Sequence, residues 1–281
     1  MHKWSEYSSS QNFIGGQITR DGTLLLIESN TQEFDFFDHP IPERNWTIRI
    51  INGKSIETVK LKNVPLVPTA VDLFSDGTIL IVQSRCLKDG QCIEQNARRY
   101  NRNGQLIEAF TLGDGIEHAQ IDEKDTIWVG YFDEGVFGNL GWNHPLGSDG
   151  VIAYTMNGHK LWGAKVYNIA DCYALNVASS KEVFFYYYDD FYLVQLTDMK
   201  ESARYQIEGD DTLKQFMWDR EGLIGQVDYY TLMRFQIMNE KITPKQTLQL
   251  VDENGKRING PVFMRGTFLY AYGKDGIYKR L

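Results

Sequence analysis

Residues 16–27 decide the fold, and they read Gly16-Gln17-Ile18-Thr19-Arg20-Asp21-Gly22-Thr23-Leu24-Leu25-Leu26-Ile27. An alternating run leads into a polar turn, and a strongly apolar run follows it, which is the pattern of a β-hairpin. The same pattern recurs at residues 70–82, 118–129, 175–186, 216–227 and 262–272, so that its turns are 41 to 56 residues apart. β-type alternation that repeats about every 40 to 50 residues is typical of the blades of a β-propeller.

A second hairpin follows each copy of this pattern. Three of these hairpins have Asn-Gly at the bend, at Asn52-Gly53, Asn103-Gly104 and Asn157-Gly158. Asn-Gly favours the type I′ turn, because both central residues of that turn need a positive φ. Each repeat therefore contributes four antiparallel strands, named A to D here, which make one blade. The sequence predicts an all-β fold, a single six-bladed β-propeller domain over residues 1–281.

The two ends of the chain are expected to share one blade. The last repeat supplies strands at Val262–Gly266, Thr267–Tyr272 and Gly276–Leu281, which is one strand short of a blade. A spare segment, Lys3–Ser8, precedes the first repeat. We expect this N-terminal strand, at about residues 3–8, to complete blade 6, because closure of the ring leaves no sheet edge exposed.

The composition is that of an acidic globular protein, with 42% hydrophobic residues and a formal net charge of −8. This charge argues against non-specific nucleic-acid binding, which needs a basic surface, and it suits a basic or cationic partner. The N-terminus has no apolar targeting segment, and no run of about 18 apolar residues occurs. We therefore expect a cytoplasmic monomer that does not contact membranes. Three cysteines are too few for a disulfide scaffold, so Cys86 and Cys92 should be thiols.

The two faces of the predicted propeller differ. The A–B and C–D turns lie on one face, called the bottom here, and they are short and polar. The B–C loops and the D–A crossovers lie on the other face, the top, around the mouth of the central channel. Three B–C loops are long, at residues 29–45, 84–96 and 131–150, and the first contains the run Phe34-Asp35-Phe36-Phe37-Asp38-His39. Long aromatic loops in a compact domain are usually functional, so blades 1–3 should raise a wall beside the channel mouth.

The expected ligand site lies at this mouth, beside blades 3 and 4. Crossovers 113–118 and 168–176 bring carboxylates, a histidine and a thiol to it, and aromatic side chains surround them. A few convergent polar groups among apolar walls are typical of a small-molecule site. The predicted ligand-binding residues are Tyr131, Asp133, Glu134, Phe137, Asn139, Trp142, Asp171, Tyr173, Asn176, Tyr188 and Asp190.

Several of these residues also have a purely structural explanation. Asp114 and Asp171 can accept hydrogen bonds from backbone amides at the start of an inner strand, and His118 can be a buried structural histidine. Cys172 has no recognisable nucleophile context and is more simply explained as a buried thiol. Residues 186–188 belong to a strand, so their rings alternate between the two sides of a blade and at least one packs in the core.

Familiar catalytic motifs are missing from the sequence. It contains no phosphate-binding loop, His-Glu-x-x-His, Cys-x-x-Cys, EF-hand or Gly-x-Ser-x-Gly pattern. No cofactor is firmly implied. A divalent metal such as Ca²⁺, which takes six to eight oxygen ligands, is compatible with Glu117, Asp133 and Asp171. If the protein is an enzyme, the candidate catalytic residues are Glu117, His118 and Asp133.

Four segments, at residues 113–117, 128–139, 169–177 and 186–191, resemble blocks in uncharacterised bacterial six-bladed propeller proteins of similar length. That resemblance implies that the corner between blades 3 and 4 matters. The repeat is also distantly similar to propellers of the NHL and senescence-marker (SMP-30, gluconolactonase-like) type. The latter resemblance implies a lactonase with a divalent metal in the channel, held by Glu, Asn and Asp from several blades.

Two functions remain open at this point. The first is a binding or interaction protein whose aromatic, acidic top face near blades 3 and 4 holds a small molecule or a protein segment. The alternative is a metal-assisted hydrolase or lyase that acts on a sugar or lactone, with the metal polarising a carbonyl or generating hydroxide.

Overall fold

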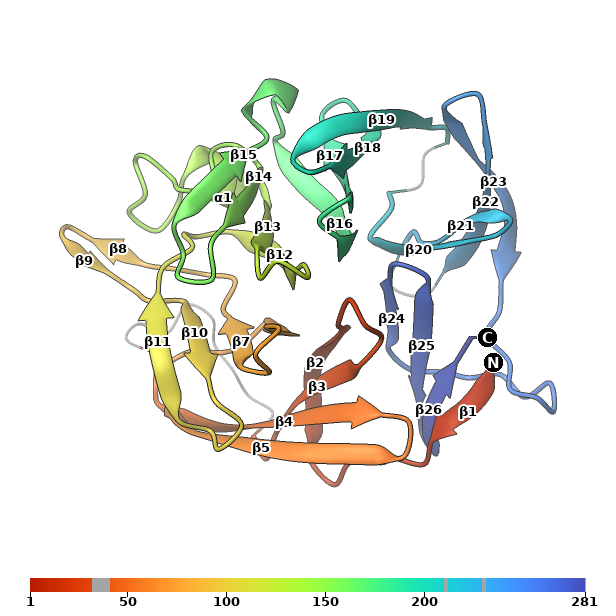
Figure 1. Cartoon of the computed structure of the whole chain (residues 1–281), viewed down its shortest axis with the longest axis horizontal. Coiled ribbons are helices and arrows are strands. Elements are labelled where there is room, and N and C mark those ends of the chain that lie inside the picture. Colours follow the sequence, from red (N-terminus) through yellow and green to blue (C-terminus); the bar gives the residue numbers. More distant parts are fainter. Residues whose placement is uncertain (32–40, 210–211, 229–230, 281) are drawn as a thin grey trace.

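The computed structural model describes residues 1–31, 41–209, 212–228 and 231–280, and its sheets are arranged like propeller blades around a central axis (Figure 1). The fold is all-β, with one short helix and one 3₁₀ turn among the described residues. No helix among them is long and apolar enough to cross a membrane.

Three four-stranded antiparallel sheets come first along the chain. The first contains β2 (Asn12–Ile18), β3 (Leu24–Ser29), β4 (Arg44–Asn52) and β5 (Ser55–Val64) in that order. The second contains β6 (Ala70–Leu73), β7 (Ile79–Val82), β10 (Ala97–Tyr100) and β11 (Leu106–Phe110). The third contains β12 (Ile116–Ile121), β13 (Ile127–Tyr131), β14 (Val151–Tyr154) and β15 (Lys160–Gly163).

An eight-stranded sheet follows, and it consists of two antiparallel halves. The first half contains β16 (Asp171–Ser179), β17 (Glu182–Tyr188), β18 (Tyr192–Thr197) and β19 (Lys200–Ile207). The second contains β20 (Gln215–Asp219), β21 (Gly222–Gln226), β22 (Leu232–Met238) and β23 (Lys241–Leu248). The outer strands β19 and β23 join the halves by a short parallel ladder that pairs Gln206 with Lys241 and Ile207 with Ile242.

The last sheet unites the two ends of the chain. It contains β24 (Val262–Arg265), β25 (Phe268–Gly273), β26 (Gly276–Lys279) and, outermost, β1 (His2–Ser5). The strand expected at residues 3–8 is thus found at His2–Ser5, where it pairs antiparallel with β26. The Trp4 ring stacks on Tyr270 with centroids 4.7 Å apart, which fixes β1 against the sheet.

The first strand of each four-stranded unit lies nearest the axis. These inner strands are β2, β6, β12, β16, β20 and β24; each contacts the next, and β24 returns to β2 (Figure 1). The apolar core lies between neighbouring sheets, where their facing side chains form separate buried clusters. Side chains that alternate along each strand supply both faces of a sheet, as the sequence pattern indicates.

A buried arginine closes the axis near the bottom face. Arg265, at the end of β24, donates hydrogen bonds to the carbonyl oxygens of Ile18, Ile121 and Val177 at 3.1, 2.6 and 2.7 Å. Its Nη1 also lies 2.7 Å from Oδ2 of Asp72, and both side chains are almost completely buried. Because these partners belong to β2, β6, β12 and β16, one guanidinium ties together five inner strands.

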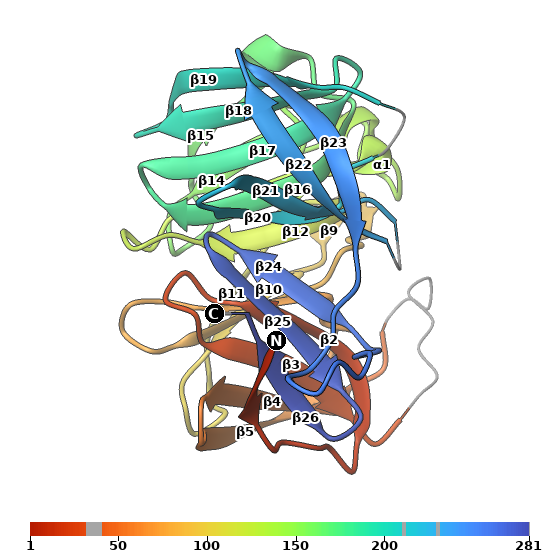
Figure 2. The same ribbon diagram turned by 90° about the vertical axis from the view of Figure 1, so that its right-hand side faces the viewer.

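Two insertions project on the top face. The hairpin of β8 (Lys88–Asp89) and β9 (Cys92–Ile93) extends from the second sheet, and helix α1 (Asp133–Phe137) follows β13. In the edge-on view of Figure 2, α1 and β9 lie on the same side of the molecule. The sequence did not predict α1, which is too short to show a helical repeat. A 3₁₀ turn, η1 (Lys165–Tyr167), leads into β16. The predicted loop feature at residues 34–39 lies outside the described residues.

Candidate functional site

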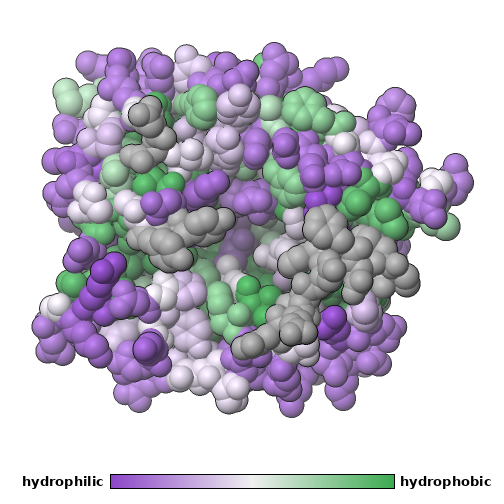
Figure 3. All heavy atoms as spheres, turned by 180° about the vertical axis from the view of Figure 1, so that it is seen from behind, coloured by the Kyte–Doolittle hydropathy of each residue, from purple (hydrophilic) through white to green (hydrophobic). Residues whose placement is uncertain are grey.

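The top face is hollowed near its centre, as Figure 3 shows from the side opposite to Figure 1. The elements of interest at this mouth are the starts of β12 and β16, the end of β17 and helix α1. The register places them together, because Ile116 pairs with Tyr131 just before α1, and Asp171 pairs with Tyr188.

A pair of glycines lets α1 approach the start of β12. Gly115 has φ of +72°, and a Cβ there would lie 2.2 Å from the backbone nitrogen of Gly135 in α1. Gly135 is equally tight, since its Cβ would lie 2.5 Å from the carbonyl oxygen of Asp114. Only glycine fits this contact at both positions. The close approach carries Asp133, the first residue of α1, toward Glu117 on β12.

Three carboxylates form what we call the acidic corner: Glu117 on β12, Asp133 on α1 and Asp171 on β16. The pKa of Asp171 is raised to about 6, mainly by burial; the charges of Glu117 and Asp133 contribute to this rise, and Lys214 opposes it. Glu117 and Asp133 are exposed, and Asp171 is partly buried. Like charges that disfavour ionisation of a carboxyl group have to lie near it, so the three side chains converge.

An aromatic cluster adjoins the acidic corner and consists of Tyr173, Tyr186, Tyr188 and Phe191. Tyr173 lies 6.3 Å from Tyr188 and 6.4 Å from Phe191 between ring centroids, and Tyr188 and Phe191 are 5.3 Å apart, edge to face. Tyr188 and Phe191 are 41% and 38% exposed. Lys214 Nζ lies 5.1 Å from the centroid of Tyr173, a cation–π contact. Aromatic surface and negative charge therefore meet at one place.

His118 and Cys172 lie beneath this surface, and His118 joins β12 to β16. His118 Nε2 lies 3.1 Å from the carbonyl oxygen of Tyr173, and it is the donor because a carbonyl oxygen only accepts. Burial lowers the pKa of His118, and burial raises the pKa of the Cys172 thiol well above its usual value. Both side chains are therefore uncharged at neutral pH. His118 positions Tyr173. Cys172 is a buried thiol, as its structural explanation requires.

Four predicted residues lie in structural contacts away from the acidic corner. Tyr131 is fully buried and its hydroxyl donates to the carbonyl oxygen of Leu112 at 2.6 Å. Trp142 is buried, and its indole N–H donates to the carbonyl oxygen of Cys86 at 2.7 Å. Asn176 donates to the carbonyl oxygen of Phe216 at 2.6 Å and accepts from the Gly266 amide at 2.9 Å. Glu134 pairs with Arg85, whose guanidinium also holds the buried Asp114 at 2.9 Å.

The remaining predicted residues are exposed at the rim. Phe137 at the end of α1 is 72% exposed, and Asn139 just beyond it is also exposed. Asp190 accepts a 3.3 Å hydrogen bond from the Tyr187 hydroxyl. The structure thus brings together Glu117, Asp133, Asp171, Tyr173 and Tyr188 out of the predicted set.

Sequence reasoning missed two members of this surface, Lys214 and Phe191. Lys214 lies in the crossover between β19 and β20, and Phe191 in the tight turn between β17 and β18. The topological rule that sends crossovers and B–C loops to the top face placed both segments there. Loop length was the signal that indicated the site, and these two segments are shorter than the long loops of the first three repeats.

The sequence is compatible with a divalent metal at the acidic corner, with Glu117, Asp133 and Asp171 as candidate ligands. Among the described residues, no three histidine, cysteine, aspartate or glutamate side chains stand close enough together to hold a metal ion. Glu117 and Asp133 lie near enough to affect the charge of Asp171, but the three carboxylates are not close enough together to share a metal ion.

The comparisons with known proteins support the fold. A model of the YxzG family matches residues 146–280, slightly less than half of the chain. No curated protein matches the chain. A chain in a nidogen/laminin complex is similar, with a TM-score of 0.54, 12% identity, and coverage of 92% of this chain and 84% of that one. At this identity the likeness shows a propeller-like fold and nothing more.

Two further solved structures show weaker likeness. Virginiamycin B lyase from Staphylococcus aureus has a TM-score of 0.46 at 12% identity, covering 97% of this chain and 85% of that one. Sqt1 from Saccharomyces cerevisiae has a TM-score of 0.48 at 10% identity, with the same two coverages. Neither carries an argument about this chain.

Proposed function

We propose that this protein binds a cationic group at the acidic corner, an ammonium or guanidinium carried by a small molecule or by a protein segment. The raised pKa of Asp171 carries the proposal, because Glu117 and Asp133 have to lie near it to contribute. A bound cation would relieve the repulsion among the three carboxylates and lie against exposed rings. Lys214 supports this view, since its own ammonium already lies over Tyr173.

We infer that the scaffold is a single six-bladed ring, in which the eight-stranded sheet counts as two blades. Its halves are each complete antiparallel units, and among the described residues two ladder pairs between β19 and β23 join them. β16 and β20 occupy separate neighbouring places among the inner strands. On this reading, the acidic corner lies between blades 3 and 4, on a rigid part of the ring where a site can be pre-organised.

Isothermal titration calorimetry with spermidine and with a short triple-arginine peptide tests the proposal. We expect binding at pH 7.5 that weakens at pH 5, because Asp171 is then largely protonated and its charge is lost. The double variant Glu117→Gln/Asp133→Asn should bind about tenfold more weakly, which corresponds to two partly exposed ion pairs.

A matched control is the double variant Glu6→Gln/Glu240→Gln, which removes the same charge from exposed positions elsewhere. It should bind like the unmodified protein. Equal losses in both double variants would show that only net charge matters and would contradict the proposal. Binding of spermidine without the peptide assigns a small ligand, and the reverse assigns a protein segment. Tight Ca²⁺ binding that the first double variant abolishes would favour the metal-assisted hydrolase instead.

A further inference from the structure

Two adjoining pockets open on the bottom face, away from the acidic corner. The larger, about 740 Å³, lies between the turn of β20 and β21 and the end of β26, and the smaller is about 390 Å³. Trp218 and Thr267 line both pockets, so the two form one groove, which we call the bottom groove. From the sequence alone we assign no functional role to the short turns of this face.

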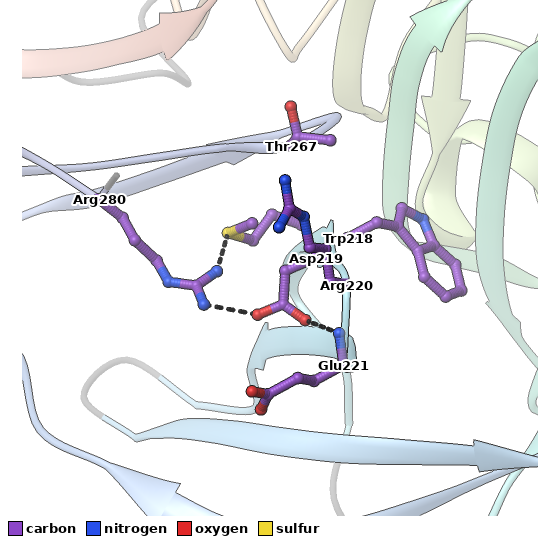
Figure 4. Close-up of a pocket in the computed structure, with 7 residues that line it drawn as sticks. Trp218, Asp219, Arg220, Glu221, Thr267 and Arg280 are labelled. Atoms are coloured by element: carbon purple, nitrogen blue, oxygen red, sulfur yellow. Dashed lines mark hydrogen bonds and ion pairs between the residues drawn. The ribbon is translucent and has the colours of Figure 1, made fainter.

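One end of the bottom groove is cationic. Asp219 Oδ2 lies 2.6 Å from Nη2 of Arg280 and 3.0 Å from Nη1 of Arg234, so its charge is already neutralised. Arg220 is exposed and forms no hydrogen bond or ion pair with any residue that the structure describes. Figure 4 shows its guanidinium directed toward Thr267. Glu221 is the second carboxylate at this end. The two carboxylates therefore face three guanidinium groups, those of Arg220, Arg234 and Arg280. This end is locally positive in a chain of net charge −8.

The other end of the bottom groove is aromatic. The Trp218 ring points away from the ionic cluster in Figure 4, and its centroid lies 5.0 Å from Phe184 and 6.2 Å from Tyr205. Phe268 lines the same pocket. The indole nitrogen of Trp218 is buried and has no hydrogen-bond acceptor among the described residues. This nitrogen is closed off from solvent, so Trp218 presents the apolar surface of its ring to the groove.

We propose that the bottom groove binds an organic anion with a flat apolar body. The anionic group is a carboxylate, phosphate or sulfonate. It pairs with the guanidinium of Arg220 and with the side of the Arg280 guanidinium that faces away from Asp219. The body lies along the Trp218 ring into the pocket of Phe184 and Tyr205. Planar guanidinium groups suit such oxyanions, and aromatic walls suit a flat ligand. This site is independent of the acidic corner.

Titration of the full chain with 8-anilinonaphthalene-1-sulfonate tests the proposal, because this probe joins a flat body to an anion. We expect one molecule to bind per chain, and inorganic phosphate alone to bind at least about tenfold more weakly. Arg220→Glu should weaken binding of the probe about tenfold. Lys54→Glu is the matched control: it makes the same charge change at an exposed turn of the same face, and it should leave affinity unchanged.

Trp218→Phe separates binding from folding. It replaces the indole by a smaller ring and so reduces the aromatic wall of the groove. Affinity for the probe should therefore fall about threefold, while the circular dichroism spectrum of the folded protein stays unchanged. Equal weakening by Arg220→Glu and Lys54→Glu would overturn the proposal. So would probe binding that neither Arg220→Glu nor Trp218→Phe changes, or phosphate that binds as tightly as the probe.

Discussion

Arg265 places a guanidinium on the axis where the inner strands approach one another, and its hydrogen bonds within the described part of the chain all go to oxygen atoms. Asp72, its ionic partner, also accepts the backbone amides of Leu73 at 2.8 Å and Ile121 at 2.7 Å. A buried charge is tolerated only when it is paired and hydrogen-bonded in this way. The buried pair of Arg265 and Asp72, which we call the Arg265 hub, therefore fixes how the inner strands meet.

Arg265→Leu should lower the free energy of unfolding by about 3 to 5 kcal/mol, because Asp72 is left as an unpaired buried charge. Urea denaturation measures the change. Lys124→Leu is the control, since Lys124 pairs with Asp198 at 2.8 Å in an exposed position and its loss should change the free energy of unfolding far less. Similar losses in both variants would remove the special role of Arg265.

The carboxyl group of Asp171 makes the free energy of unfolding depend on pH. Its folded pKa is raised from 3.8 to about 6, so between these values the folded state binds more protons than the unfolded state. The free energy of unfolding therefore falls as pH rises through this window and then levels off.

Asp171→Asn lacks this loss of stability. Its free energy of unfolding should exceed that of the unmodified protein by about 1 to 2 kcal/mol at pH 7.5, after allowance for solvent screening, and match it below pH 4. Urea denaturation at the two pH values checks this. A variant that is less stable at pH 7.5 would show that the Asp171 carboxylate is stabilised in the folded state.

At the scale of elements, the sequence predicted what repeats and missed what occurs once. The hairpins read from Gly22 and its five equivalents are found as β2–β3, β6–β7, β12–β13, β16–β17, β20–β21 and β24–β25. Alternation and turn chemistry are local signals, so one chain is enough to read them. Helix α1, the β19–β23 ladder and the Arg265 hub depend on contacts between distant segments, which no local pattern contains. For the same reason, the predicted site included Tyr131, Trp142 and Asn176, although their hydrogen-bond partners lie elsewhere.

The element with the clearest energetic consequence is β1. Deletion of residues 1–8 removes its ladder to β26 and the Trp4–Tyr270 stack, and it exposes β26 as a sheet edge. We expect a loss of about 3 kcal/mol or more in the free energy of unfolding, measured by denaturation. A synthetic peptide of residues 1–9 added in trans should restore part of it. A truncated protein as stable as the full chain would show that β1 does not close its sheet.

At the scale of the whole molecule, the two faces carry opposite local charge. The top mouth has converging carboxylates beside exposed rings. The bottom groove has Arg220, which pairs with none of the described residues, beside Trp218. The net charge of −8 alone would suggest a uniformly acidic surface. A ring of blades permits this separation, since its turns and its loops project from opposite faces of one rigid scaffold.

The central claim is that three carboxylates converge at the top mouth and bind a cation there. Carbon-13 NMR titration of the Asp171 carboxyl group, assigned with Asp171→Asn, tests it most directly. The account predicts a pKa of about 6 that falls in Glu117→Gln/Asp133→Asn and falls again when the unmodified protein is saturated with spermidine. A pKa near 3.8 that neither the variant nor spermidine changes would contradict it.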